Sequence, residues 1–191
     1  MKKIIATAAC ALSAASVFAQ YPERAINYVI PFVPAGESDI AARLQGKVAT
    51  KITGKEFVVQ NKPGAGGAVA WAQLNSLPAD GYTVMGTNLP HILLQPLEAQ
   101  PTYKTEDIVN VFYFHFTPDA LVVAADSPYK TFADFAAAAK ANPGKLNVAG
   151  SATNSPAHMA TARLDIQGGM KVTYIPLKGT GEIITQLLGK H

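Results

Sequence analysis

The chain has 191 residues, of which 49% are hydrophobic and 15% are charged, so its composition is that of a globular protein and not of a disordered one. Its formal net charge is +3, and no cluster of lysines or arginines occurs, which argues against nucleic acid as a partner. The single cysteine, Cys10, lies in the first 19 residues. The rest of the chain therefore has no disulfide, no thiol nucleophile and no cysteine-ligated metal.

Residues 1–19 have the pattern of a secretory signal peptide. Lys2 and Lys3 form a basic start, Ile4–Phe18 is apolar and rich in alanine, and Val17-Phe-Ala19 fits the small-residue rule for cleavage. The apolar stretch is short for a membrane span, which needs about 20 residues. We therefore expect a secreted protein whose mature chain begins at Gln20.

The stretch that follows predicts a buried strand that turns sharply into a helix. Tyr28–Phe32 is an apolar run without alternation, typical of a parallel strand covered on both faces. Pro34 and Gly36 end this run, and Ser38 or Asp39 is expected to cap the helix that follows. Such a turn presents backbone N–H groups at the positive end of a helix dipole, where an anion can bind.

The predicted helix ends at Gly54, and its apolar residues recur at i, i+4 as one stripe made of Ile40, Leu44, Val48 and Ile52. Beyond it, we expect strands at residues 56–60, 82–85, 109–116, 121–125, 146–149 and 172–175. Helices are expected at residues 68–77 (burying Val69, Trp71 and Leu74), 132–141 (capped by Thr131 with Asp134), after Pro156, and at 182–188. Phe112, Phe114 and Phe116 alternate as one buried strand face would.

The recurrence of strand, small-residue loop and helix predicts βαβ units and a parallel sheet. Ligands of open parallel sheets bind beyond the carboxyl ends of the strands. The loops expected at those ends are rich in Gly, Ser, Thr, Asn or Pro, and comprise residues 34–39, 61–67, 86–88, 150–155 and 176–181.

A nucleotide-binding loop is not supported. Gly64-Ala-Gly-Gly67 follows a predicted strand and opens a helix, but the dinucleotide fingerprint requires glycine where Val69 stands. The chain also contains no G-x-x-x-x-G-K-[ST] motif. The glycines are explained by a tight turn, which is compatible with a loop that faces a ligand.

Catalytic and metal sites are also disfavoured. Ser155, His158 and Asp39 are the residue types of a hydrolase triad, but no G-x-S-x-G elbow surrounds the serine. The four histidines are scattered, without the H-x-x-x-H spacing of a metal site. Without a catalytic constellation or a cofactor motif, the sequence favours a binding protein over its runner-up, a secreted α/β hydrolytic enzyme.

Several motifs, in order over nearly the whole chain, resemble the periplasmic solute-binding proteins of tripartite tricarboxylate transporters, the Bug family. They include Val29-Ile-Pro-Phe-Val-Pro34 with Ser38-Asp39, Val59-Gln-Asn-Lys-Pro-Gly-Ala-Gly-Gly67, Pro78-Ala-Asp-Gly-Tyr-Thr83, Lys140-Ala-Asn-Pro-Gly144 and Lys178-Gly179. The resemblance implies an α/β fold like that of type II periplasmic binding proteins, with two βαβ domains around a cleft. Residues 20–125 would then form the N-terminal part of domain 1, and residues 126–191 an incomplete domain 2.

The resemblance also implies a function. The protein would be a monomer in the periplasm that captures a small carboxylate (a di- or tricarboxylate, an amino acid or a related organic acid) and delivers it to membrane permease subunits, without a cofactor. Backbone amides, hydroxyls and water would hold the carboxylate. The ligand-binding residues carried over are Pro34, Gly36, Ser38, Asp39, Thr87, Asn88, Ser151, Asn154, Ser155, His158, Lys178 and Gly179.

Two departures from the family pattern have consequences. Ala35 and Glu37 stand where the family usually has glycine, so Ala35 stiffens a turn that favours positive φ, and Glu37 places a negative charge beside an anion site. Family members also continue well past His191, so we expect a truncated protein that is unstable or aggregates on its own. A non-functional remnant of a binding protein is the alternative function.

Overall fold

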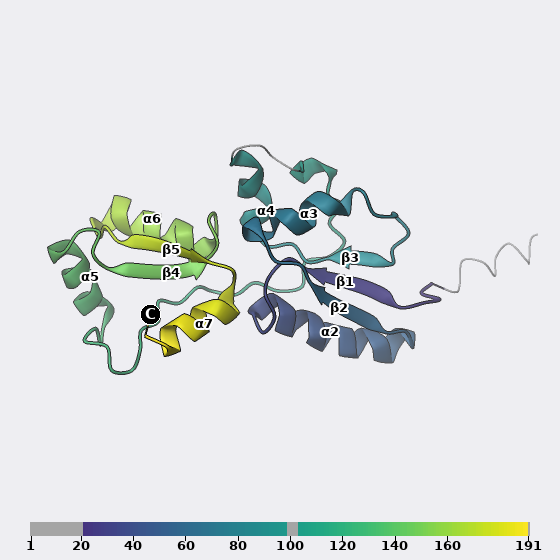
Figure 1. The fold of residues 1–191 in the computed structure, drawn as a ribbon, viewed down its shortest axis with the longest axis horizontal. Helices are drawn as coiled ribbons and strands as arrows, with labels where there is room; N and C mark the ends of the chain where they lie inside the picture. Colours follow the sequence, from purple (N-terminus) through teal and green to yellow (C-terminus); the bar gives the residue numbers. More distant parts are fainter. Residues whose placement is uncertain (1–20, 99–102, 191) are drawn as a thin grey trace, which may run out of the picture.

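The computed structural model describes residues 21–98 and 103–190, so the predicted signal peptide lies outside the described residues. The described chain forms two parallel sheets (Figure 1). The N-terminal sheet has the order β2-β1-β3 and consists of β1 (Ile26–Ile30), β2 (Phe57–Asn61) and β3 (Thr83–Met85). The C-terminal sheet pairs β4 (Asn147–Ser151) with β5 (Thr173–Leu177).

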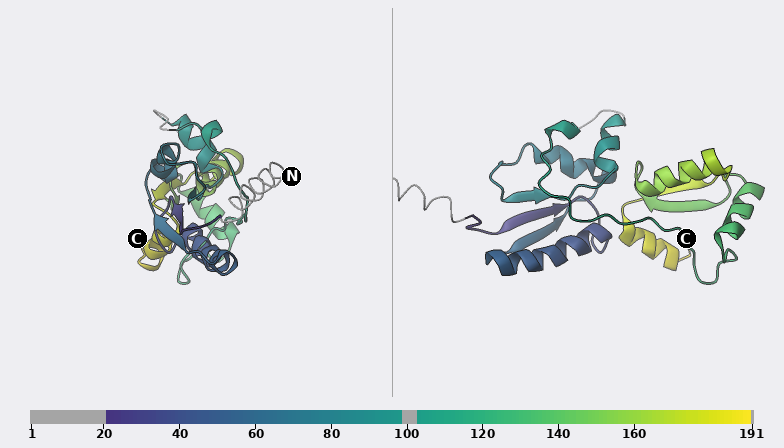
Figure 2. Two further views of the ribbon diagram at one scale, coloured as in Figure 1. Left: turned by 90° about the vertical axis from the view of Figure 1, so that its right-hand side faces the viewer. Right: turned by 180° about the vertical axis from the view of Figure 1, so that it is seen from behind.

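Both sheets confirm the prediction of parallel βαβ units. In the N-terminal sheet, Tyr28 of the central strand β1 lies opposite Val59 of β2 and Val84 of β3. Val29 and Ile30 are almost fully buried, because helices cover both faces of this sheet: α2 on one side and α3 on the other (Figures 1 and 2). An apolar strand without alternation is suited to that position.

Helix α2 (Glu37–Thr53) was predicted correctly, but its cap was not. Gly36 is the N-cap residue and no side chain caps the helix, so Ser38 and Asp39 are not caps. The predicted apolar stripe points to solvent, and Ile52 is 79% exposed. The buried residues are instead Asp39, Ala42 and Gly46, because the helix lies close to β2, where a Cβ atom on Gly46 would come within 3.3 Å of Phe57.

Helix α3 (Ala68–Leu74) covers the other face of the N-terminal sheet. Trp71 is fully buried and packs with Ile92, Tyr103 and Ile108 in one hydrophobic cluster, with Leu74 partly buried against it. Val69 was predicted to be buried and is 47% exposed. The short helices α4 (His91–Leu94), η3 (Gln95–Leu97) and η4 (Thr105–Asp107) follow β3 along the chain.

The strands expected at residues 109–116 and 121–125 are absent from the described structure. The backbone of residues 109–124 is neither strand nor helix, and runs from the N-terminal part of the molecule towards the C-terminal sheet (Figure 2). Phe112 and Phe116 are 80% and 90% exposed, so the alternating phenylalanines do not form a buried face here. The prediction was wrong because no described strand pairs with this segment, and a strand requires a partner.

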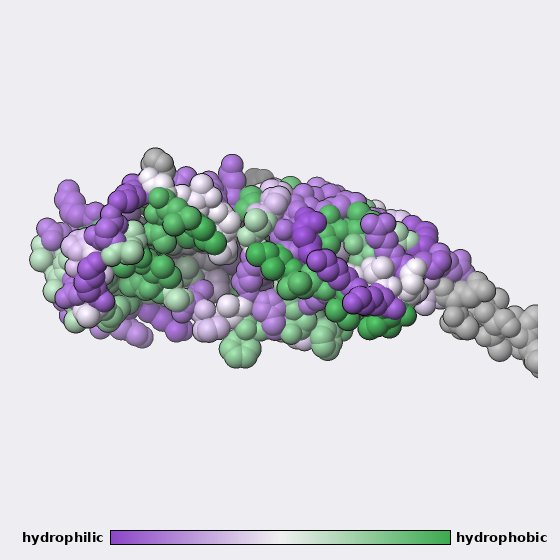
Figure 3. Space-filling view, turned by 90° about the horizontal axis from the view of Figure 1, so that it is seen from below, coloured by the Kyte–Doolittle hydropathy of each residue, from purple (hydrophilic) through white to green (hydrophobic). Residues whose placement is uncertain are grey.

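In the C-terminal part, α5 (Phe132–Ala141) begins with the predicted capping box between Thr131 and Asp134. Helices α6 (Pro156–Gly168) and α7 (Thr180–Leu188) lie on opposite sides of the β4–β5 sheet (Figures 1 and 2). Seen from below, α2 and α7 both carry apolar side chains on the surface (Figure 3), among them Ile184 and Leu188 of α7. Of the helices in the described ranges, none is long and apolar enough to span a membrane.

Candidate functional site

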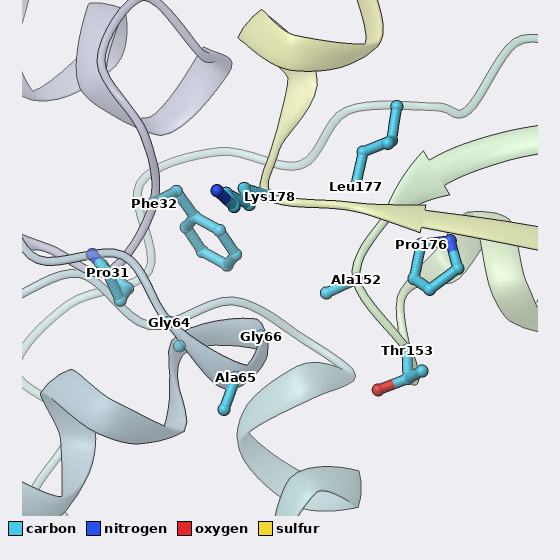
Figure 4. A pocket seen from close by; sticks show the side chains of 11 residues that line it. Pro31, Phe32, Gly64, Ala65, Gly66, Ala152, Thr153, Pro176, Leu177 and Lys178 are labelled. Atoms are coloured by element: carbon cyan, nitrogen blue, oxygen red, sulfur yellow. The ribbon is translucent and has the colours of Figure 1, made fainter.

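A pocket of about 270 Å³ lies where the carboxyl ends of strands from both sheets meet. The N-terminal sheet contributes Pro31 and Phe32, which follow β1, and residues 64–67, which follow β2. The C-terminal sheet contributes Ala152 and Thr153 after β4, with residues 176–178 at the end of β5. In Figure 4 the Phe32 ring and the Lys178 side chain lie on one side of this pocket, with Ala152 and Thr153 opposite. This is the place where parallel sheets bind ligands.

The glycine loop after β2 forms one wall of the pocket. Gly64, Gly66 and Gly67 all have positive φ, which glycine adopts without a steric cost. A Cβ atom on Gly66 would come within 2.2 Å of the Gln95 amide nitrogen, and one on Gly67 would collide with the Trp71 ring. The loop was expected at a strand end, but its residues were not among the predicted binding residues. The position of residues 64–67 between a predicted strand and a predicted helix is the feature of the sequence that indicates a ligand-facing loop.

A polar network fixes the loop after β1. The carboxylate of Asp39, which is buried, accepts hydrogen bonds from the backbone N–H of Ala35 (3.0 Å) and from Arg43 (3.1 Å). Arg43 also donates to the Asn61 side-chain oxygen (3.3 Å), and the Asn61 amide donates to the carbonyl oxygen of Phe32 (3.0 Å). Asp39 is therefore a positioning residue of this loop, and its carboxylate has its own partners.

The charge of Asp39 is stabilised by these contacts. Burial alone would raise the pKa of Asp39, but the hydrogen bonds from Arg43, from the Ala35 N–H and from Asn61 outweigh it, so the pKa is lowered. Ala35 itself has φ = 61°, so the expectation that this turn takes positive φ is confirmed.

Glu37, in the first turn of α2, is bound to the segment that leads away from the N-terminal sheet. Its carboxylate accepts hydrogen bonds from His115 (2.7 Å) and from the Thr117 hydroxyl. Burial would raise the pKa of Glu37, but these two hydrogen bonds and the charge interaction with His115 lower it. Glu37 is therefore ionised at neutral pH, at the start of the helix where an anion was expected to bind.

The loop after β4 is organised by α6. Ser155 is fully buried, and its hydroxyl accepts the backbone N–H of His158 (3.0 Å) and pairs with the Tyr174 hydroxyl (2.8 Å). His158 Nδ1 accepts the backbone N–H of Asn154 (3.1 Å), so His158 orients the loop, and its ring stacks on Tyr174. Because the Ser155 hydroxyl and one nitrogen of the His158 ring already have these partners, the arrangement is not that of a hydrolase nucleophile and base.

Hydrogen bonds also join the short helices α4 and η3 to the end of β4 and the loop after it, beside the pocket. His91 Nε2 lies 3.2 Å from the Ser151 carbonyl oxygen, and the Gln95 amide donates to that of Thr153 (3.2 Å). The Asn154 amide donates to the Glu98 carboxylate (2.8 Å). Burial lowers the pKa of His91, so its ring is neutral and donates from Nε2, while Nδ1 has no partner among the described residues.

Two helix starts meet at the edge of the site. Gly36, before α2, lies against the first turn of α7, where a Cβ atom on Gly36 would be 3.7 Å from the Gly181 nitrogen. Gly179, before α7, is buried against the Val33 side chain. The backbone N–H of Lys178 donates to the Glu182 carboxylate (2.7 Å), so this amide is already engaged.

The structure brings together only some of the residues that the resemblance implied. Lys178 is the one that lines the 270 Å³ pocket. Ser38 and Asn88 are joined by a hydrogen bond of 3.3 Å, and Gly36 lies near the start of α7. None of the remaining residues lines this pocket. Asp39 and His158 lie in the first turns of α2 and α6, Ser151 is the last residue of β4, and the others lie in the connections that follow strands: Pro34, Thr87, Asn154, Ser155 and Gly179.

A family model described as the tripartite tricarboxylate transporter family receptor, TctC, matches residues 40–191. The chain belongs to the TctC receptor family. A UPF0065 protein of Cupriavidus necator is 36% identical to this TctC chain over 192 residues, a match that covers 97% of the chain and 58% of that protein. The chain therefore spans little more than half of the length of this relative.

Solved structures show the same fold. The periplasmic binding protein BugD matches the TctC chain with a TM-score of 0.72 and 30% identity, covering 89% of the chain and 57% of BugD. Rpa4515 of R. palustris, solved with adipate, matches with a TM-score of 0.71 and 26% identity, covering 88% of the chain and 57% of Rpa4515. The predicted α/β fold of a periplasmic binding protein is thus confirmed, and the predicted family is correct.

Proposed function

We propose that the protein is a periplasmic receptor that captures a small carboxylate and delivers it to the permease subunits of a tripartite transporter. The observation that carries this proposal is the pocket between the two sheets, in which Lys178 is the only formally charged residue among the described lining residues. A pocket with one cation and several backbone-rich loops is suited to a small organic anion. Rpa4515, a structural relative, was solved with adipate, a carboxylate.

The loops around this pocket support binding rather than catalysis. The Ser155 hydroxyl, one His158 ring nitrogen and the Asp39 carboxylate each already have structural partners, and Asp39 lies in a different element from the other two. The function is therefore that of a non-enzymatic receptor. Ser38, Thr87, Asn88 and the loop 151–155 are proposed to complete the ligand site, since they stand at strand ends of the two sheets.

The remaining assignments follow from the family and are likewise proposed. The receptor acts in the periplasm after cleavage of residues 1–19, and it works as a monomer that docks on membrane permease subunits. Residues 20–125 belong to domain 1 and residues 126–191 to domain 2, because the two parallel sheets lie on either side of this boundary. The relatives are longer than this chain, so their further residues are expected to extend domain 2.

The experiment is a calorimetric titration of the purified protein with a panel of small acids, including malate, adipate, hexanoate and aspartate, each beside the amide in which its carboxylates are neutralised. Binding of at least one acid, without binding of its amide, is expected. Lys178→Met should weaken that binding by about tenfold or more, because it removes the cation from the pocket. Lys62→Met is the matched control, since the Lys62 amine bonds Gln73 outside the pocket (3.2 Å). Absence of binding for every acid would refute the proposed function.

A further inference from the structure

Two buried polar side chains lie behind the pocket, one helical turn apart. Gln95 of η3 and His91 of α4 are 6% and 3% exposed, and neither is among the described residues that line the pocket. Burial of a polar side chain is unfavourable unless the side chain is hydrogen-bonded. The partners of these two residues therefore show what they hold in place.

Gln95 joins two walls of the pocket. Its amide lies against the glycine loop, where a Cβ atom on Gly66 would come within 2.2 Å of the amide nitrogen. The same nitrogen donates to the carbonyl oxygen of Thr153 (3.2 Å). Figure 4 shows Ala65 and Gly66 on one side of the pocket and Thr153 on another. A single side chain thus ties the loop after β2 to the loop after β4.

His91 repeats this arrangement one turn earlier. Its ring packs edge-on against Phe32, a lining residue that follows β1, with the ring centroids 5.5 Å apart. Its Nε2 lies 3.2 Å from the carbonyl oxygen of Ser151, the last residue of β4, and donates to it because a carbonyl oxygen only accepts. Each of the two side chains therefore contacts a lining residue after a strand of the N-terminal sheet and bonds a backbone carbonyl of the C-terminal part.

The loop that these hydrogen bonds hold is conformationally strained. Ala152 and Asn154 have φ = 61° and φ = 58°, a region that residues with a Cβ atom adopt rarely. Such conformations persist only where the surrounding structure determines them. Thr153 lies between these two residues and lines the pocket, so the hydrogen bond from Gln95 helps to hold the loop in the form that faces a ligand.

We propose that Gln95 and His91 form a brace that keeps the walls of the pocket together and thereby sets how slowly a bound ligand is released. The inference rests on the proposed function, because it concerns ligand release from the same site, whereas the coupling of the walls is a property of the free protein. Both are positioning residues, since they act through the loops that they hold. Separation of the walls breaks both hydrogen bonds, so the brace acts on the dissociation rate more than on the association rate.

Amide hydrogen exchange in the free protein tests the brace without any ligand. Gln95→Met keeps nearly the size of glutamine but has no donor, and His91→Phe keeps a ring against Phe32 but has no donor. Each variant should speed exchange at the amides of Ala152 and Asn154 by about fivefold or more, because one buried hydrogen bond is lost. Both amides are hydrogen-bonded in the structure, so their protection is measurable.

The matched control is Gln73→Met, the same substitution at an exposed position of α3. It should change exchange at Ala152 and Asn154 by less than about twofold. Unchanged exchange at these two amides in both Gln95→Met and His91→Phe would overturn the brace. Faster exchange confined to residues 91–98 would also overturn it, because the effect would not reach the opposite wall.

Gly66→Ala tests the link between the walls from the other side. Its new Cβ atom must displace the Gln95 amide, so exchange at Asn154 should become about fivefold faster or more. In a Gln95→Ala background the amide is gone, and Gly66→Ala should then change exchange at Asn154 by less than about twofold. Equal acceleration in the two backgrounds would overturn the proposal, because the glycine loop would then act without Gln95.

Malate, adipate, hexanoate and aspartate are the probes for ligand release. Stopped-flow fluorescence of the single tryptophan follows it, since the Trp71 ring lies against the glycine loop, where a Cβ atom on Gly67 would be 2.5 Å from that ring. For each acid that binds, Gln95→Met should raise the dissociation rate by about fivefold or more and change the association rate by less than about twofold. Gln73→Met should change neither rate.

The outcomes separate the brace from the proposed function. Faster amide exchange in Gln95→Met with an unchanged dissociation rate would overturn the role of the brace in ligand release and leave the receptor function standing. If no acid of the panel binds the unmodified protein, the proposed function fails and the role in release fails with it. The exchange measurements still decide in that case whether Gln95 and His91 couple the walls of the pocket.

Discussion

Gly181, in the first turn of α7, lies directly against the carbonyl oxygen of Pro34: a Cβ atom at Gly181 would be 2.9 Å from that oxygen. This contact joins the loop after β1 to the helix after β5, so it sets how closely the two sheets approach one another beside the pocket. The neighbour is a backbone atom, which cannot rotate away as a side chain would. Glycine is therefore required at this position for the observed approach.

Gly181→Ala is expected to push α7 away from the first loop. The free energy of unfolding should fall by about 1–3 kcal/mol, the usual cost of overpacking. Hydrogen exchange at the amides of residues 35–37 and 179–182 should become faster at the same time. Gly168→Ala is the matched helical control, because the atom nearest to its new Cβ is the flexible end of Met170. Unchanged exchange in both loops of Gly181→Ala would contradict this account.

The sequence predicted the elements that depend on local chemistry. Apolar runs predicted the strands around Val29 and Val59. Side-chain chemistry predicted the capping box at Thr131, and a position where glycine is usual predicted the turn at Ala35. Each of these features depends only on residues that are neighbours in the sequence. The errors concern contacts between distant residues. The apolar stripe of α2 points to solvent, whereas such a stripe commonly faces the core, because Gly46 lies close to Phe57 and only a small residue fits there.

The candidate site shows the same division. Loops at strand ends were predicted from the order of strands and helices along the chain, and one residue of those loops, Lys178, lines the pocket. The contribution of Phe32 and of residues 64–67 was not predicted as binding, because it depends on how one sheet faces the other. No local pattern indicates that arrangement, nor the hydrogen bond between Gln95 of η3 and Thr153 of the loop after β4.

Ala35→Gly is expected to stabilise the protein. Ala35 has φ = 61°, a conformation that costs a residue with a Cβ atom about 1 kcal/mol and costs glycine nothing. The free energy of unfolding should rise by up to about 1 kcal/mol. The larger entropy of glycine in the unfolded chain reduces this gain. The fluorescence of the single tryptophan, the buried Trp71, measures the unfolding. Ala42→Gly, within α2, should destabilise the protein by about 1 kcal/mol. A loss of stability in Ala35→Gly would count against the described turn.

Asp39 is expected to make the protein sensitive to acid. Its pKa is lowered in the folded state, so its contribution is fully present above the unfolded pKa of about 4 and is lost as the pH falls through the folded value. Asp39→Asn should lower stability at pH 7 by about 1.5–3 kcal/mol, because charge-assisted hydrogen bonds are lost. Its stability should then depend less on pH below about 4 than that of the unmodified protein.

The control for this measurement is Asp80→Asn. The Asp80 carboxylate is 42% exposed and pairs with Arg24 on the surface, so its removal should change stability by less than about 1 kcal/mol at any pH. Denaturant unfolding between pH 2.5 and pH 7 compares the three proteins. If Asp39→Asn keeps the full acid sensitivity, the buried network of Asp39 and Arg43 is not its source.

Glu37 is expected to oppose the binding of dicarboxylates. Its carboxylate is ionised and held by His115 and Thr117 at the start of α2, close to the loops that form the site. Replacement by glycine or by glutamine removes a repulsion of at least about 1 kcal/mol at close range, so adipate affinity should rise roughly fivefold or more. Calorimetry measures this change, with Glu106→Gln, in the exposed part of η4, as the control. Unchanged or weaker adipate binding to both Glu37 variants would reject the prediction.

The exposed segment that follows η4 is expected to cause self-association of this chain. Val109, Val111, Phe112 and Phe116 are each at least 80% exposed, and the backbone of residues 109–123 makes no backbone hydrogen bond to any other described residue. An extended apolar segment with unpaired N–H and C=O groups offers an edge to other chains. The longer relatives carry further residues that could cover such a surface.

The double variant Phe112→Lys, Phe116→Lys should therefore stay monomeric up to a concentration that is about tenfold higher or more. Its free energy of unfolding should change by less than about 0.5 kcal/mol. Light scattering and analytical ultracentrifugation provide the measurement. Ile166→Lys is a suitable control, since Ile166 on α6 is 84% exposed but lies in a hydrogen-bonded helix and offers no free backbone edge. A monomeric unmodified chain at high concentration would disprove the role of this segment. Equal improvement by Ile166→Lys would assign self-association to general surface hydrophobicity instead.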